Sequence, residues 1–478
     1  MESVTKKISD FVDADFDKSA LPGLMDFIRI PNLSKNFDPE WNSNGLLEKA
    51  AKHVKSWIEA QNIKGLNIEY IKNDDLSPLL FIEVAGTDKD AGTVLMYGHF
   101  DKQPHMVGWS EGLGPVDPVI KDGKLYGRGS NDDGYSIFSA ITAIKACQTN
   151  GLAHPRVVFL MEGDEESGST HINTYIERVK DKIGTPSMIF ILDAGCLNYE
   201  QFWLVTSLRG NIKPRLNVKI INEGVHSGDA SGIVPDTFRI IRELLGRLED
   251  PKTGDIIKEL QVNIPPNRYQ EGYETSKVMG DALFQKFPWL DKSKQQGVST
   301  DNFQLYLNRH WRPTLTVIGQ DGLPPCEKAG NVLRPETTIS LSIRLPPTLN
   351  ADKAFDSVKE ILEKNPPYGA KVELLKGNNN HGWSAPDFAD YLSNALKDAS
   401  KSYFGKPLMA TGEGGSIPFV NKLNIRYPKA QFLVCGVAGP GANAHGPNEM
   451  LNIPYTKQFT KCIAYILSQS AEHIKGNQ

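Results

Sequence analysis

Several side chains of the kinds that bind metal ions follow short apolar runs in this sequence. The candidates are His99, Asp101, Asp132, Glu165, Glu166, Asp193 and His445. They combine imidazole nitrogens with carboxylate oxygens and no thiolate, a mixture suited to zinc, with manganese or cobalt as alternatives. The excess of carboxylates indicates two divalent metal ions, which can share a bridging carboxylate and activate one water molecule for hydrolysis.

Two local spacings favour a shared site for these residues. His99 and Asp101 are two residues apart, so both side chains point to the same side of an extended chain. Glu165 and Glu166 are adjacent like charges after an apolar run, a costly arrangement unless a cation neutralises at least one of them. With Asp164 they could instead form a solvated acidic loop. Because His99 and Asp193 in other segments are further candidate ligands, the metal site is favoured over a solvated acidic loop.

Asp132 and Asp133 precede a helix that is expected to begin near Tyr135. Both are therefore at or near the N-cap position, where aspartate is common. We expect Asp133 to be a plain helix cap. For Asp132 the sequence leaves two alternatives, a helix cap and a metal ligand.

The ten histidines differ in their surroundings. Surface or packed-core positions are expected for His53, His154, His171, His310 and His473. His105, in a proline-containing loop, is expected to play at most a supporting part. Three others remain as candidates: His226 in Val225-His226-Ser227-Gly228, His381 in a polar hinge, and His445 in a glycine-rich loop.

The elements that must position these residues are typical of an α/β fold. Between about residues 80 and 200, β-branched apolar runs alternate with helical patterns, which predicts a mainly parallel sheet with helices on both faces. Strands are expected at 93–97, 157–161, 188–192 and 432–437. Ligands of open α/β sheets bind beyond the carboxyl ends of the strands. Distant segments should therefore bring their polar residues to one crevice.

The middle of the chain has a different pattern, in the order β-α-β-β-α-β. This order predicts a small antiparallel sheet with helices on one face, an α+β domain inserted into the first. We expect a discontinuous catalytic domain of residues 1–210 and 382–478, and an inserted domain of residues 211–381. The polar stretch of about 251–312 does not fit this pattern and is expected to be an elaborated excursion.

Composition excludes several classes of protein. The 53 Lys and Arg against 57 Asp and Glu give a net charge of −4, which argues against nucleic acid or an anionic membrane as the partner and favours a small substrate. The five cysteines are scattered without a Cys-x-x-Cys pair, so no disulfide framework is expected. The first residues contain acidic side chains where a signal peptide needs an apolar stretch. We therefore expect a cytoplasmic protein.

Other functional classes require motifs that differ from those found. A nucleotide-binding oxidoreductase requires G-x-G-x-x-G after the first strand of a βαβ unit, and the glycines here lie elsewhere. A serine hydrolase of the α/β type requires G-x-S-x-G on a strand-to-helix turn. The run Gly108-Trp109-Ser110-Glu111-Gly112 has this spacing, but it lies in a stretch rich in glycine and proline and not between a strand and a helix. A non-catalytic relic of a metalloenzyme would have lost a metal ligand or Glu165, and none is missing.

A series of short motifs runs through the chain. They are Gly98-His99-Phe100-Asp101, Gly127-Arg128-Gly129, Asp132-Asp133-Gly134, Glu165-Glu166-Ser167-Gly168-Ser169, Asp193, Leu208-Arg209-Gly210, Val225-His226-Ser227-Gly228, Ser342-Ile343-Arg344, Glu413-Gly414-Gly415-Ser416-Ile417-Pro418, Ala444-His445 and Asn448-Glu449. Together, in this order, they resemble the dinuclear zinc peptidase and deacylase family, which includes carnosinases, cytosolic non-specific dipeptidases, aminoacylases and bacterial glutamate carboxypeptidases. The dipeptidase branch is the nearest match.

The resemblance implies a ligand set for two metal ions. His99 and Asp193 would bind one ion, and Glu166 and His445 the other. Asp132 would bridge the two ions.

The resemblance also implies catalytic roles. Asp101 would orient His99, and Glu165 matches the general base that takes a proton from the attacking water and delivers it to the leaving amine. The inserted domain corresponds to a lid and dimerisation domain, so a homodimer is expected. His226 would reach the active site of the partner subunit and stabilise the oxyanion.

The substrate-binding residues implied by the resemblance lie in the second half of the chain. Arg344 matches an arginine that clamps the substrate's C-terminal carboxylate, and Asn331 stands where the dipeptidases have a threonine. Ser416, with the backbone N–H of Gly415, matches a further carboxylate contact. His381 stands near a histidine position of the dipeptidases, and it either replaces that contact or is an ordinary hinge residue.

The sequence therefore predicts a dinuclear metal-dependent dipeptidase that cleaves short peptides. An N-acyl-amino-acid deacylase or a γ-glutamyl-type carboxypeptidase is the alternative.

Overall fold

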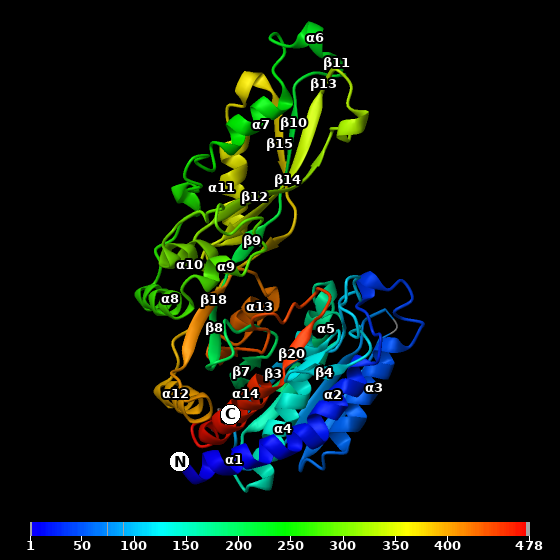
Figure 1. Cartoon of the computed structure of the whole chain (residues 1–478), viewed down its shortest axis with the longest axis vertical. Coiled ribbons are helices and arrows are strands. Elements are labelled where there is room, and N and C mark those ends of the chain that lie inside the picture. The colour runs from blue at the N-terminus through cyan, green and yellow to red at the C-terminus, as the bar shows by residue number, and fades with distance from the viewer. Residues whose placement is uncertain (1, 74, 89, 475–478) are drawn as a thin grey trace. The chain divides into compact units, whose positions relative to one another are not determined.

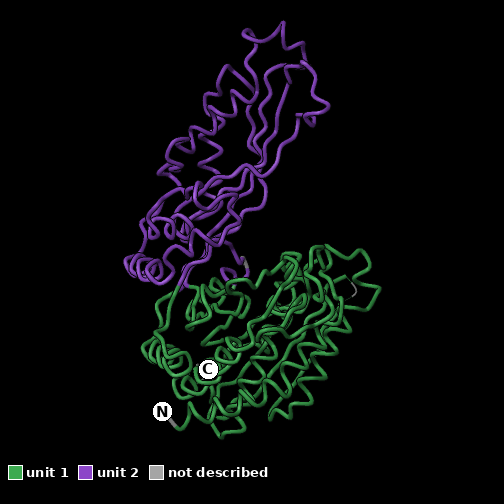
Figure 2. The backbone as a smooth tube through the Cα atoms, viewed as in Figure 1, with its two compact units in different colours: residues 1–205, 386–410, 423–478 green, residues 206–385, 411–422 purple. Residues whose placement is uncertain are grey.

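A computed structural model of the chain describes residues 2–73, 75–88 and 90–474 (Figure 1). The chain forms two compact units (Figure 2). Unit 1 consists of Met1–Val205, Pro386–Ala410 and Leu423–Gln478, and unit 2 consists of Thr206–Ala385 and Thr411–Lys422. Residues 206–210, 382–385 and 411–422, which we expected in the catalytic domain, belong to unit 2.

The larger sheet has the strand order β1-β2-β6-β3-β7-β19-β8-β17, and β18 pairs with β8. Its strands are β1 (Leu66–Ile71), β2 (Leu79–Val84), β3 (Thr93–His99), β6 (Arg156–Glu162), β7 (Pro186–Ile191), β8 (Trp203–Leu208), β17 (Trp383–Ser384), β18 (Met409–Glu413) and β19 (Gln431–Val434). The four neighbours β6, β3, β7 and β19 are parallel, whereas β1, β2, β8 and β17 pair antiparallel. The α/β prediction is confirmed, with parallel pairing confined to the centre of a mixed sheet.

The parallel strands at the centre of the sheet are buried between helices on both faces. Strands β3, β6 and β7 are buried along almost their whole length, which explains their continuous apolar runs. The connections β3–α4–β6 and β6–α5–β7 cross in opposite directions along the sheet. Because such crossovers are right-handed, α4 and α5 lie on opposite faces of the sheet.

Helices cover this sheet and form much of the core of unit 1. They are α1 (Glu2–Asp15), α2 (Leu21–Ile28), α3 (Leu46–Glu59), α4 (Tyr135–Thr149), α5 (Ile172–Ile183), α12 (Asp390–Phe404) and α14 (Ile453–Ser470). Helix α14 packs against α1, α4 and α12. Helix α4 is buried almost all round, because it lies between the sheet and α14. A small sheet of β4 (Val119–Lys121), β5 (Lys124–Tyr126) and β20 (Met450–Asn452) completes the unit.

The sheet of unit 2 is antiparallel, and it confirms the predicted β-α-β-β-α-β order. Its elements in chain order are β9 (Gly210–Ile212), β10 (Arg215–Lys219), α7 (Thr237–Leu245), β12 (Thr314–Asp321), β14 (Glu336–Leu345), α11 (Ala351–Glu363), β15 (Lys371–Leu375) and β16 (Asn379–Asn380). The alternate residues of β14 that are buried pack with α7 and α11 in one hydrophobic core. The other face of β14 is partly exposed.

Further elements of unit 2 lie outside this sheet. The predicted excursion contains α8 (Pro266–Met279), α9 (Ala282–Gln285) and α10 (Asn302–His310), which pack on one another. A two-stranded sheet joins β11 (Val225–His226) to β13 (Val332–Leu333), next to the short helix α6 (Ser227–Ala230). Helix α13 (Pro418–Arg426) follows β18, and its residues from Leu423 on belong to unit 1.

Within the described part of the chain, no helix has both the length and the apolar character needed to cross a lipid bilayer.

Candidate metal centre

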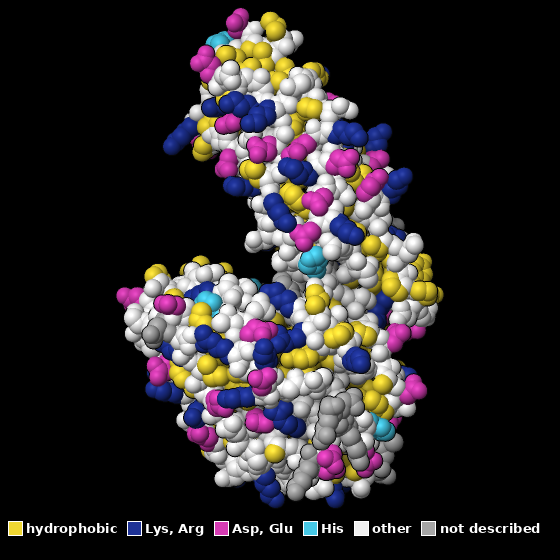
Figure 3. All heavy atoms as spheres, turned by 180° about the vertical axis from the view of Figure 1, so that it is seen from behind, with side chains coloured by type: hydrophobic (Ala, Val, Ile, Leu, Met, Phe, Trp, Pro, Cys, Tyr) yellow, Lys and Arg dark blue, Asp and Glu magenta, His cyan; other side chains and the backbone are white. Residues whose placement is uncertain are grey.

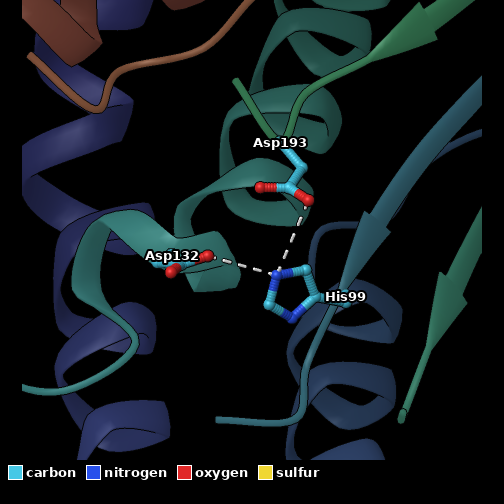
Figure 4. Close-up of side chains that lie close together, drawn as sticks. All are labelled: His99, Asp132 and Asp193. Carbon is cyan, nitrogen blue, oxygen red and sulfur yellow. Dashed lines mark hydrogen bonds and ion pairs between the residues drawn. The ribbon is translucent and has the colours of Figure 1, made fainter. Parts of the chain in front are cut away.

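Three of the predicted metal ligands meet at the carboxyl end of the parallel strands (Figure 4). His99 is the last residue of β3, Asp132 lies in the turn before α4, and Asp193 follows β7. The Nε2 atom of His99 is 3.3 Å from Oδ1 of Asp132 and 4.0 Å from Oδ2 of Asp193. Both carboxylates point toward this nitrogen in Figure 4.

A second group forms on the other side of the same aspartate. The Nε2 atom of His445 lies 3.0 Å from Oδ2 of Asp132 and 3.3 Å from Oε2 of Glu166. His445 adopts a positive φ of 66° in the loop between β19 and β20. Asp132 therefore presents one carboxylate oxygen to His99 and the other to His445, as a bridging ligand must.

Asp101 connects the first group to the loop after β6. Its backbone carbonyl lies 3.1 Å from Nδ1 of His99, so Nδ1–H can donate to it and leave the Nε2 lone pair available for a ligand bond. The carboxylate of Asp101 accepts from the backbone N–H groups of Glu165 and Glu166, at 3.1 Å each. One buried side chain thus holds two site segments together.

Glu165 lies next to the predicted metal ligands, and its side chain is partly exposed. Its Oε2 atom is 4.0 Å from Nε2 of His99, and its side chain is 25% exposed. Burial raises the pKa of Glu165 well above its ordinary value, and the charge of Asp193 adds to this. A carboxylate with a raised pKa at an accessible position is suited to proton transfer.

The electrostatics of the cluster favour a bound cation. Burial raises the pKa of Glu166 to about 7, and Asp132 adds to this effect. Hydrogen bonds to Asp132 and Glu166 raise the pKa of His445 to about 10. Burial alone would lower the pKa of His99, but its hydrogen bonds to Asp101 and Asp132 raise it overall. Positive charge is thus strongly stabilised among these carboxylates.

The donor set fits divalent metal ions. Nitrogen and carboxylate oxygen atoms converge in three overlapping groups, each able to hold an ion. The Oε1 atom of Glu166 is buried and has no hydrogen-bond partner among the residues that the structure describes. A buried acceptor without a hydrogen bond costs folding free energy, and coordination of this oxygen to a metal ion would remove that cost.

Glu449 is a residue whose importance the sequence did not predict. Its buried carboxylate accepts from Arg128 Nη1 at 2.6 Å and from the backbone N–H groups of Gly129, Asn131 and Asp132 at 3.1 to 3.3 Å. It therefore holds the turn that carries Asp132. The only sequence signal was its place in a family motif four residues after His445.

Asp133 corrects one expectation. Helix α4 has Gly134 at its N-cap, with no side-chain capping bond, so the prediction of a plain cap at Asp133 was wrong. The Oδ2 atom of Asp133 instead accepts from the backbone N–H of His99 at 3.1 Å. This bond fixes the end of β3, and it could not be read from local spacing because the partners are 34 residues apart.

His226, which was predicted to stabilise the oxyanion, and Asn331, which was predicted to contact the substrate, lie together in unit 2. His226 is in β11, where it pairs with Val332 of β13, next to Asn331. The backbone N–H of Ser227 donates to the carbonyl of Asn331 at 2.9 Å. His226 and Asn331 are both exposed, and Nδ1 of His226 accepts from the backbone N–H of Gly228.

The remaining predicted substrate contacts also belong to unit 2. Arg344 is on the partly exposed face of β14, and burial lowers the pKa of its guanidinium. Gly415 and Ser416 lie in the partly exposed turn after β18. His381 directly follows β16, and its Nδ1 accepts from the backbone N–H of Ala351, the first residue of α11, at 3.2 Å.

Comparison with known proteins yields a family match. Residues 95–469 match the model of peptidase family M20/M25/M40. The cysteinylglycine-S-conjugate dipeptidase of Corynebacterium striatum is 28% identical over 412 residues, which cover 85% of this chain and 86% of that protein. The Beta-Ala-His dipeptidase of Homo sapiens is 27% identical, covering 83% of this chain and 78% of that protein.

Solved structures share the fold. The dipeptidase Dug1p of Saccharomyces cerevisiae aligns with a TM-score of 0.72 at 23% identity, covering 99% of each chain. At 23% identity, this similarity shows that the fold is shared.

Proposed function

Because this chain belongs to peptidase family M20/M25/M40, we propose that it hydrolyses the amide bond of dipeptides or other short peptides with the help of two divalent metal ions. The observation that carries this proposal is the carboxylate of Asp132, whose two oxygens face His99 at 3.3 Å and His445 at 3.0 Å. The relatives named as dipeptidases support the choice of a short peptide as substrate.

His99 and Asp193 would hold one ion, and Glu166 and His445 the other, with Asp132 shared between them. Zinc suits this donor set best, and manganese or cobalt is the alternative. The bound ions would supply Lewis-acid polarisation of the scissile carbonyl and lower the pKa of water.

Glu165 is the general base in this proposal. It takes a proton from the attacking water and delivers it to the leaving amine. Asp101 positions both His99 and the backbone of Glu165 through the bonds described above. In this proposal Asp101 therefore contributes to catalysis by orienting His99 and Glu165.

Unit 2 would bind the substrate's C-terminal carboxylate. Arg344 offers a planar guanidinium for two parallel hydrogen bonds, and Ser416 with the N–H of Gly415 offers further donors. Asn331 and His381 are additional candidates for substrate contacts. This proposal makes unit 2 a lid as well as a dimerisation domain.

We also propose a homodimer in which His226 of one subunit stabilises the oxyanion in the other subunit. His226 in β11 and Asn331, which directly precedes β13, are both exposed, and this supports a contact with a second chain.

All five cysteines are free, which is consistent with a reducing compartment such as the cytoplasm.

A substrate panel tests the proposed function. Unblocked dipeptides, N-acetylated amino acids and γ-glutamyl compounds are assayed with zinc, manganese and cobalt in turn, before and after chelation. We expect dipeptides to be turned over fastest, chelation to abolish the activity reversibly, and Arg344→Ala to raise KM by about tenfold or more. Faster turnover of N-acetylated amino acids or γ-glutamyl compounds would favour the alternative functions, and chelator resistance would refute the metal mechanism.

A further inference from the structure

Unit 2 contains a pocket of about 300 Å³ formed by the α9–α10 excursion and the adjoining strands. Its walls include Arg209, Phe284, Phe287, Trp289, Leu305 and Arg309. The volume is at the small end of the range for ligand pockets. None of these residues belongs to the metal cluster of unit 1 or to the proposed substrate contacts.

One wall of the pocket is apolar and well ordered by local contacts. The rings of Phe284 and Trp289 stack with centroids 4.5 Å apart, and Nε1 of Trp289 donates to the carbonyl of Phe284 at 2.8 Å. With its indole N–H satisfied by the backbone, Trp289 offers the pocket a fixed apolar surface.

Apolar surface is also left open around the pocket. Phe287 and Val298, which both line it, are 47% and 82% exposed. Figure 3 shows hydrophobic side chains gathered over the part of unit 2 that contains α8. An apolar ligand in the pocket would cover part of the exposed surface of Phe287 and Val298.

The other wall is positively charged. Burial lowers the pKa of Arg209 to about 9, and the charges of Arg344 and Arg309 add to this. Glu413 is an acidic residue whose charge acts on Arg309. Among the described residues that line the pocket, Arg209 and Arg309 are basic and none is acidic.

The guanidinium of Arg309 can donate at least one further hydrogen bond. Its Nη1 atom is buried, and no atom in the described part of the chain is its hydrogen-bond partner. A buried guanidinium in an excess of positive charge is stabilised by an added anion. A carboxylate fits best, because it can accept two parallel bonds from one guanidinium.

We propose that this pocket binds a small apolar monocarboxylate, with the carboxylate at Arg309 and the apolar tail against Trp289, Phe284 and Leu305. The combination of one charged end and one aromatic wall selects an alkyl or aryl carboxylic acid over a neutral molecule or an inorganic anion.

The test is isothermal titration of the full-length protein with octanoate and 4-phenylbutyrate, and with octanamide and inorganic phosphate for comparison. We expect saturable binding of at least one carboxylate, and binding of octanamide and phosphate weaker by about tenfold or more. Absence of saturable carboxylate binding, or equal binding of octanamide, would overturn the proposal.

Variants locate the site. Arg309→Gln should weaken carboxylate binding by about tenfold or more, and Arg309→Lys should restore part of it. Arg312→Gln is the matched control, because Arg312 follows the end of the same helix, α10, but its guanidinium bonds to Asn308 and Gln304. Val298→Asp, at a highly exposed position, should fold normally and weaken binding by charge repulsion. Unchanged binding in both Arg309→Gln and Val298→Asp would refute the site.

Discussion

At the scale of single residues, the candidate centre depends on what each oxygen of a carboxylate faces. Asp132 divides its two oxygens between two histidines, whereas the adjacent Asp133 bonds to the backbone of His99. These two consecutive aspartates thus have different structural roles. From the local sequence, both could be helix caps, because capping involves only a few neighbouring residues. The bridging position of Asp132 depends on contacts with segments far along the chain.

Glu165→Gln should lower kcat by about a hundredfold or more, since the amide cannot accept the proton from water. The metal content, measured by mass spectrometry, should stay that of the wild type. Glu59→Gln, at an exposed position of α3, is the matched control and should leave kcat unchanged. A Glu165→Gln enzyme with wild-type kcat would remove Glu165 as the base.

Glu449→Gln should weaken metal binding by about 10- to 100-fold, the usual cost of losing a group that orients metal ligands. A glutamine has one acceptor oxygen in place of two, and its NH₂ group would face either the N–H donors of the Asp132 turn or the guanidinium of Arg128. Metal affinity is measured by competition with a chelator, and kcat at saturating metal should change far less than affinity. Unaltered affinity in a folded variant would contradict the positioning role.

At the scale of elements, the parallel strands at the centre of the larger sheet decide which segments meet. The ends of β3, β6 and β7 lie at one edge and carry His99, the Glu165–Glu166 pair and Asp193. These strands could be predicted because their runs are continuously apolar. The antiparallel flanks of the sheet were not predicted, since strand direction depends on connections and is not encoded in the apolar pattern.

His381→Ala should lower the free energy of unfolding by about 1 kcal/mol, the typical value of a helix-capping bond. The reason is that Nδ1 of His381 accepts from the first turn of α11, and Nε2 lies 3.5 Å from Asp352. Thermal or urea unfolding measures this loss.

The same variant separates the two alternatives for His381. If the side chain serves only the helix, KM stays within about twofold of the wild type. A rise in KM of about tenfold, corresponding to about 1.4 kcal/mol, would instead identify a substrate contact.

At the scale of the whole molecule, the chain combines an α/β unit with an antiparallel unit of separate core. The metal cluster belongs to unit 1, and His226, Asn331, Arg344 and Ser416 belong to unit 2. In the proposed mechanism, one subunit supplies the metal ligands and the other supplies His226. Activity would then be a property of the dimer.

Mixing two inactive variants tests this arrangement. His226→Ala should remain folded and metallated but slow, and Glu165→Gln should also be slow. In a mixed dimer, the site with intact Glu165 receives His226 from the Glu165→Gln subunit, so activity should return to about a quarter of the wild-type level after random exchange of subunits. Light scattering confirms the dimer. Two slow variants that stay slow when mixed, with exchange verified, would exclude a shared site.

The sequence by itself determined the residue types of the site, their order and the strands that precede them. These features follow from local patterns, because apolar periodicity and ligand chemistry involve residues close together along the chain. Only the tertiary structure decided that Asp132 faces two histidines, that Glu449 supports its turn, and that Arg309 and Trp289 border one pocket. These relations join residues brought together by packing, up to 317 positions apart for Glu449 and Asp132, and no local pattern encodes such distances.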